Sequence, residues 1–82
     1  MRFADLLKSI RQHKGVQQQE LAEKVGVSPA TVSDWEHGRK KPRYTNLVKV
    51  ANVLEADPVE LVIALLQDSR SARRDKHGKT DD

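Results

Sequence analysis

Only two residues, Gly26 and Val27, separate two segments that have the character of helices. Glycine closes the first segment, because it readily adopts the left-handed backbone conformation that ends helices. Ser28 and Pro29 begin the second segment, since serine is a preferred N-cap and the missing N–H of proline costs nothing at the first helical position. A connection this short does not leave two helices free to lie antiparallel. The sequence therefore predicts that two helices cross sharply at residues 26–27.

Three more helices are predicted from apolar residues that recur every three or four positions. They span residues 2–13, 45–55 and 57–67. The last of them has the clearest start, with Asp57 at the N-cap and Pro58 at the first helical position. No strand pattern accompanies these segments, so the expected fold is all-α, a compact bundle of five helices.

The two short helices on either side of Gly26 differ in their boundaries. The first has Gln17 at its N-cap, a poor capping residue, although Glu20 is placed for a reciprocal bond. The second ends before Gly38, after eight or nine residues. The residues of all five helices that are expected to face the interior are Phe3, Leu6, Leu7, Ile10, Leu21, Ala22, Val25, Val32, Trp35, Leu47, Val50, Ala51, Leu54, Pro58, Leu61, Val62 and Leu65.

Length and composition allow one small domain with a thin core. The chain has 82 residues, of which three are aromatic and none is cysteine, so aliphatic side chains must do the packing and no disulfide can form. The longest apolar run, residues 61–66, is far too short to span a bilayer, and a cytoplasmic location is expected. We expect a domain over residues 1–67. Residues 68–82 contain one alanine and no larger apolar residue, so a disordered tail is expected there.

A basic cluster follows the second short helix. Its cations are Arg39, Lys40, Lys41 and Arg43. These four charges exceed the net charge of the whole chain, which is +3. A local cluster of this kind favours a polyanionic partner, although a solvated turn is an equally good interpretation of the cluster alone.

The segment QQELAEKVGVSPATVSDWEHGRKKP, residues 18–42, resembles the DNA-binding domain of the lambda-repressor-like Xre/Cro family. The matching residues are Gln18, Glu20, Leu21, Ala22, Val25, Gly26, Val27, Ser28, Val32, Ser33, Trp35, Glu36, Gly38 and Pro42. The resemblance extends from about Phe3 to Val62. It implies a helix-turn-helix whose third helix enters the major groove of double-stranded DNA. It also implies a sequence-specific transcriptional regulator, most simply a dimeric repressor at a palindromic operator.

The resemblance assigns a set of base-contacting positions to the third helix and its N-cap. These are Ser28, Pro29, Ala30, Thr31, Ser33 and Asp34. Pro29 and Ala30 offer apolar surface to a thymine methyl group, and Asp34 could accept a hydrogen bond from a cytosine amino group. No Arg, Gln or Asn stands on this face, so either DNA shape supplies part of the specificity or the site is read weakly. For Ala30 and Thr31, a plain helix surface is nearly as good an interpretation.

Phosphate contacts are expected from residues on both sides of the third helix. They are Gln18, Arg39, Lys40, Lys41 and Arg43. Gln18 opens the second helix, where its amide and the helix N-terminus could meet one phosphate together. Arg43 could also enter the minor groove, whereas His37 is expected to be a solvated residue at a helix end.

Two further sets of residues have expected structural roles, one within the bundle and one between two copies of the chain. The resemblance implies a partly buried ion pair between Arg11 and Glu36, which would orient the third helix against the first. Val59, Ile63 and Leu66 form a second apolar stripe on the last helix. We expect this stripe to be a dimer interface, with a tail that folds back over it as the alternative.

An enzyme is not expected. The three histidines, His13, His37 and His77, lack metal-ligand spacing and a nucleophile partner, and no glycine-rich phosphate loop is present. No cofactor, metal, small-molecule ligand or membrane partner is predicted. The alternative function is a protein-binding adaptor with the same fold, such as an antitoxin or a coactivator-like module. In such an adaptor the tail and the last helix would hold the partner.

Overall fold

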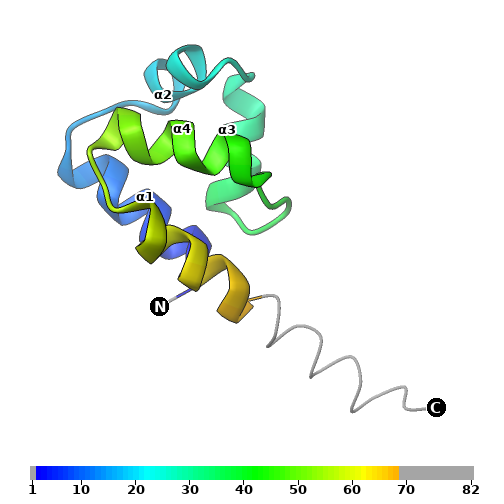
Figure 1. The fold of residues 1–82 in the computed structure, drawn as a ribbon. Coiled ribbons are helices and arrows are strands. Elements are labelled where there is room, and N and C mark those ends of the chain that lie inside the picture. Colours follow the sequence, from blue (N-terminus) through cyan, green and yellow to red (C-terminus); the bar gives the residue numbers. More distant parts are fainter. Residues whose placement is uncertain (1, 69–82) are drawn as a thin grey trace.

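The computed structural model describes residues 2–68, and these form the five expected helices (Figure 1). The first four are α1 (Phe3–His13), α2 (Gln18–Val25), α3 (Pro29–Glu36) and α4 (Tyr44–Leu54). Residues 58–68 are also helical and are called the C-terminal helix below. No strand is present in this part of the chain. The predicted all-α fold is confirmed.

The helix boundaries around α3 follow from capping groups that the sequence identifies. Gly26 ends α2 with a φ of 91°, in the left-handed region. The hydroxyl of Ser28 accepts the backbone N–H of Thr31 at 3.2 Å, which satisfies one of the free donors at the start of α3. The carboxylate of Asp57 accepts the N–H of Val59 at 2.9 Å at the start of the C-terminal helix. These boundaries agree with the prediction.

Two details of the other boundaries differ from the prediction. Helix α4 begins at Tyr44 and ends at Leu54, and Glu55 is its C-cap with a φ of 55°. A residue with a β-carbon therefore occupies a left-handed position that glycine usually fills. Glu20 forms an ion pair with Lys24 at 3.5 Å, and the N-cap of α2 makes no side-chain cap bond.

The core lies where α1, α2 and α4 surround the inner face of α3, with the C-terminal helix closing one side. Helix α2 packs on α3 and on α4, and α1 packs on α3. The buried apolar residues are Phe3, Leu7, Leu21, Ala22, Val25, Val32, Trp35, Leu47, Val50, Ala51, Leu54, Leu61, Ala64 and Leu65. Most of them are the residues predicted to face inward, and Trp35 is buried as expected. Ala64 was not predicted, and Leu6, Ile10, Pro58 and Val62 are only half-buried.

The end of the C-terminal helix corrects one predicted boundary. Asp68, assigned to the tail, is helical, and its carboxylate accepts the backbone N–H of Phe3 at 2.8 Å. The carboxylate thereby caps α1 from a residue 65 positions away, and α1 and the C-terminal helix lie side by side (Figure 1). The predicted disordered tail otherwise lies outside the described residues, at positions 69–82.

None of the helices described between residues 2 and 68 combines the length and the apolar character that a bilayer crossing requires.

Candidate nucleic-acid interface

Helix α3 presents a polar outer face beside the basic turn. Val32, Trp35 and Glu36 are its buried residues. Ser28, Pro29 and Ala30 are exposed at its start, and the rest of the outer face, Thr31, Ser33 and Asp34, is half-buried. All six residues assigned to base contact thus lie away from the core. Most of their side chains are small, so another molecule could approach the helix backbone closely.

Several polar groups of this outer face bond to each other. The hydroxyls of Ser28 and Thr31 are 2.9 Å apart. The Nδ1 atom of His37 lies 2.8 Å from the carbonyl oxygen of Ser33 and 3.3 Å from its hydroxyl. His37 is exposed, as predicted, and it folds back on the last turn of α3. These local bonds orient the hydroxyls, and each hydroxyl keeps capacity for one more partner.

A buried polar network holds α3 against α1 and α2. Glu36 accepts two hydrogen bonds from Arg11, at 2.5 Å from Nε and 3.1 Å from Nη2. A third bond, from Nη1 of Arg11 to the carbonyl oxygen of Val16, measures 2.7 Å. The side chains of Arg11 and Glu36 are 11% and 1% exposed. The pair is therefore almost completely shielded from water, so its hydrogen bonds are needed to offset the cost of burying the two charges.

Gln18 joins this network, and the sequence did not indicate that it would. Its Nε2 donates to Oε1 of Glu36 at 2.9 Å. One of the two amide hydrogens is therefore engaged, and the other amide groups remain available to a ligand. Glu36 thus fixes the position of a residue that was predicted to meet a phosphate.

The helix N-termini differ in whether a side chain caps them. Asp68 caps α1 and Ser28 caps α3, but the N-caps of α2 and α4, Gln17 and Arg43, make no such bond. The first N–H groups of a helix are free donors, and the helix dipole adds partial positive charge there. The uncapped ends of α2 and α4 therefore suit anions, and the end of α4 was not predicted to do so.

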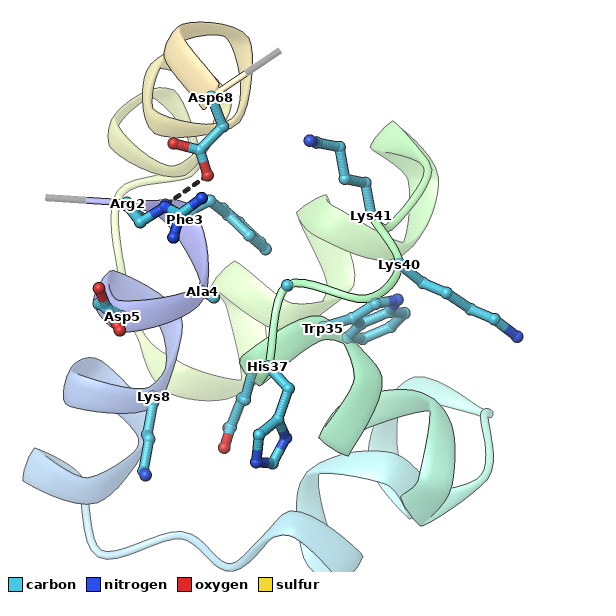
Figure 2. A pocket seen from close by; sticks show the side chains of 12 residues that line it. Arg2, Phe3, Ala4, Asp5, Lys8, Trp35, His37, Lys40, Lys41 and Asp68 are labelled. Carbon is cyan, nitrogen blue, oxygen red and sulfur yellow. Dashed lines mark hydrogen bonds between the residues drawn. The ribbon is translucent and has the colours of Figure 1, made fainter. Parts of the chain in front are cut away.

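Within the basic turn, the cations differ in their surroundings. Arg39 donates from Nε to Oδ1 of Asp34 at 2.9 Å, and Nζ of Lys40 lies 3.8 Å from Oδ2. Lys41 and Arg43 are exposed and take part in none of the ion pairs formed within residues 2–68. The side chains of Lys40 and Lys41 point in opposite directions (Figure 2).

A hollow of about 660 Å³ opens between the start of α1, the end of α3 and the basic turn (Figure 2). The bond between Phe3 and Asp68 borders it. Its charged lining mixes cations and carboxylates, namely Arg2, Asp5, Lys8, Glu36, Lys40, Lys41 and Asp68. No group of histidine, cysteine and acidic residues that could hold a metal ion occurs in the described residues.

The residues predicted for dimerisation lie on the C-terminal helix. Val59, Ile63 and Leu66 are 60%, 48% and 46% exposed, and they form one stripe of the C-terminal helix. This helix lies at the opposite end of the molecule from α2 (Figure 1). Tyr44 and Val48 are also exposed apolar residues, on α4, and sequence reasoning did not single them out.

Solved structures with the same arrangement of helices include proteins bound to DNA. The P22 c2 repressor in complex with a synthetic operator superposes with a TM-score of 0.70 at 26% identity, covering 74% of this chain and 92% of the repressor chain. SinR, a master regulator for biofilm formation, in complex with DNA superposes with a TM-score of 0.68 at 33% identity, covering 73% of this chain and 97% of the SinR chain. The clp gene regulator ClgR from Corynebacterium glutamicum superposes with a TM-score of 0.71 at 33% identity, covering 89% of this chain and 80% of the ClgR chain.

Similarity to curated proteins covers a shorter part of the chain. The uncharacterized HTH-type transcriptional regulator YqaE of Bacillus subtilis is 32% identical over 53 residues, which are 65% of this chain and 46% of YqaE. The antitoxin HipB of Escherichia coli K12 is 36% identical over 53 residues, which are 65% of this chain and 60% of HipB. The chain therefore matches about half of the length of these relatives.

A family model supports the same assignment. The helix-turn-helix model HTH_3 matches residues 7–61, which include α2, α3 and the basic turn. The predicted family resemblance is confirmed, and membership of this family agrees with the prediction that the chain is not an enzyme. The chain belongs to the HTH_3 helix-turn-helix family.

Proposed function

We propose that this chain is a sequence-specific DNA-binding transcriptional regulator that inserts α3 into the major groove. The observation that carries the proposal is the outer face of α3, whose side chains are small and which lies beside cations and uncapped helix N-termini. Small side chains let the helix approach base edges, and the surrounding positive groups suit phosphates. The P22 c2 repressor and SinR, with which the chain shares its fold, have been solved with DNA.

The base contacts that we propose for α3 are few and partly apolar. Pro29 and Ala30 would meet thymine methyl groups, while the hydroxyls of Ser28, Thr31 and Ser33 would donate to or accept from base edges. None of these side chains can make the bidentate contacts that discriminate most strongly between bases. Sequence-dependent DNA shape would therefore supply part of the specificity.

Phosphate contacts would fix the position of α3 in the groove. On one side, Gln18 and the N-terminus of α2 would bind a phosphate, with the amide held in place by Glu36. On the other side, Lys41, Arg43 and the N-terminus of α4 would bind the flanking backbone. Arg39 and Lys40 belong to the same turn, and their availability depends on Asp34.

Two copies of the chain would bind a palindromic operator as a dimer. The exposed stripe of Val59, Ile63 and Leu66 supports this proposal. Association with a second copy would remove this apolar surface from water, which is favourable. Two-fold symmetry in the protein would match half-sites about one helical turn apart. A regulator with this architecture would act in the cytoplasm and repress by blocking polymerase access.

Selection of bound sequences from a random DNA pool tests this function. We expect an enriched motif with two-fold symmetry and half-sites spaced about one helical turn apart. The variant Ala30→Glu is the negative control, because it places a carboxylate at the base edges and leaves the core unchanged. A wild-type pool without enrichment would contradict a sequence-specific regulator.

The second candidate function is an antitoxin-like adaptor, supported by the similarity to the antitoxin HipB over residues of this fold. In this role the apolar stripe of the C-terminal helix would bind a protein partner, and DNA contact would be secondary. A heparin column separates the two functions. A DNA regulator is retained until high salt, whereas an adaptor elutes at low salt and keeps its partner after the cations at positions 39–43 are neutralised.

A further inference from the structure

The carboxylate of Asp34 lies where the outer face of α3 meets the basic turn. Nε of Arg39 donates to Oδ1 at 2.9 Å, and Nζ of Lys40 forms an ion pair with Oδ2 at 3.8 Å. The Asp34 side chain is 23% exposed, whereas those of Arg39 and Lys40 are 59% and 70% exposed. The anion is therefore enclosed by the turn, and the two cations remain accessible to another molecule.

The backbone of Asp34 holds the same two residues. Its carbonyl oxygen accepts the N–H of Arg39 at 2.9 Å and the N–H of Lys40 at 3.4 Å. Both cations are thus tethered close to the carboxylate before their side chains are oriented. A pair that the backbone brings together loses less side-chain entropy than one formed between independent surface residues.

This geometry conflicts with a base-reading role for Asp34. A carboxylate that reads cytosine must direct a lone pair at the base edge, but here each oxygen faces a cation of the same chain, which competes with the base for the carboxylate. It would also place a negative charge in the strongly negative groove of DNA. The contacts made by Asp34 are instead those that a phosphate of the DNA backbone would make with Arg39 and Lys40.

We infer that Asp34 is an internal counter-anion for Arg39 and Lys40, which lowers the affinity of the basic turn for DNA phosphates without reading a base. The inference rests on the proposed function. The turn then contains two kinds of cation: Lys41 and Arg43 are available to phosphates, whereas Arg39 and Lys40 are already partly neutralised. Asp34 is a positioning residue that tunes affinity and salt sensitivity equally for every DNA sequence.

The charge-removing variant Asp34→Asn tests this inference through the salt dependence of DNA binding. Each additional phosphate contact steepens the plot of log K against log salt concentration by about 0.9. We expect the variant to steepen this slope by about 0.9 or more and to tighten binding to random duplex on the order of tenfold at about 50 mM salt. The base preference in a selection experiment should stay unchanged. Asp34→Glu, which keeps the charge, should keep the wild-type slope.

Glu60→Gln is the matched control, because it removes one negative charge from an exposed residue of the C-terminal helix. If Asp34→Asn and Glu60→Gln change the slope equally, the effect is net charge alone and the inference is overturned. A changed preference at a single base pair in Asp34→Asn would overturn it as well, since that result marks a base-reading residue. A wild-type chain that binds no duplex at low salt would instead contradict the proposed function itself.

If Asp34→Asn loses its helical circular dichroism, a comparison of two cations of the turn tests the inference without altering Asp34. Arg39 is paired and Lys41 takes part in no ion pair within residues 2–68. We therefore expect Arg39→Ala to reduce the salt slope by clearly less than the reduction of about 0.9 expected for Lys41→Ala. Equal reductions would contradict a counter-anion role for Asp34.

Discussion

At the scale of single residues, the arrangement of the site depends on Glu36. This one carboxylate accepts bonds from Arg11 of α1 and from Gln18 of α2 while it belongs to α3. It therefore connects the helix proposed to read DNA with the residue proposed to bind a phosphate. Because the carboxylate is almost fully buried, each of its partners is needed to compensate for lost hydration.

Arg11→Ala tests the importance of this network for stability. Removal of the arginine leaves the Glu36 carboxylate buried with one remaining donor, so we expect the free energy of unfolding to fall by about 3 kcal/mol. Urea denaturation followed by circular dichroism measures the change. Lys8→Ala is the control, because Lys8 is an exposed residue of the same helix. Equal effects of the two substitutions would contradict the structural role of the pair.

Residue roles that depend on a helix end were the hardest to predict from the sequence. The family resemblance implied the Arg11–Glu36 pair, which the structure contains. The same resemblance assigns Asp34 to base contact, which stays a prediction, but it did not indicate the ion pair of Asp34 with Arg39. The chain turns at Gly38, whose φ is 75°, and this turn brings Arg39 back to Asp34. Such a contact depends on the direction that the backbone takes after the helix ends, and the spacing of apolar residues in the sequence does not reveal this direction.

At the scale of secondary structure elements, the helix N-termini fall into two groups, those capped by a side chain and those whose free N–H groups could meet a ligand. The starts of α1 and α3 are closed by side chains, and those of α2 and α4 are not. Sequence patterns predicted the caps at Ser28 and Asp57, because both use local residues. The cap on α1 could not be predicted, since Asp68 reaches Phe3 only when the C-terminal helix packs beside α1.

Glu55 offers a test of element boundaries that is independent of DNA. It ends α4 with a φ of 55°, a conformation that costs about 1–2 kcal/mol for a residue with a β-carbon. Glycine removes this cost but loses about 0.4–1 kcal/mol through greater freedom in the unfolded chain. We expect Glu55→Gly to raise the free energy of unfolding by about 0.5 kcal/mol.

Glu55→Ala is the control for this experiment. It also removes the exposed ion pair with Lys14, whose atoms lie 3.6 Å apart, but it retains a β-carbon. We expect no gain in stability from this variant, because an exposed pair contributes little. A chevron or urea titration in which glycine destabilises the protein more than alanine would contradict the strain at this position.

At the scale of the whole molecule, the surface divides into two regions with different proposed tasks. The outer face of α3 is polar, and the cations of the basic turn and the uncapped ends of α2 and α4 add positive charge around it. The stripe of Val59, Ile63 and Leu66 is apolar and belongs to the C-terminal helix, whose last residue, Asp68, lines the same hollow as Lys40 and Lys41. We propose that this division of surface chemistry lets one small domain bind DNA and self-associate at the same time.

Ile63→Asp tests self-association. A charge at the centre of the stripe has no partner after burial, so we expect the proposed dimer to dissociate and the sedimentation coefficient to fall to that of a monomer. Val48→Asp is a matched control, since Val48 on α4 and Ile63 are almost equally exposed, at 46% and 48%. An unchanged mass for Ile63→Asp, or equal loss in both variants, would remove the stripe from the interface.

Amide chemical-shift mapping tests whether α3 enters DNA with its outer face. A labelled chain is titrated with a duplex that carries the selected motif and with a scrambled duplex of equal length. We expect large shifts for Ala30, Thr31 and Ser33 with the selected duplex, smaller ones with the scrambled duplex, and little change at Val59 and Ile63. If Ala30, Thr31 and Ser33 stay unshifted while the duplex is bound, the DNA contacts another surface and α3 is not the helix that enters the groove.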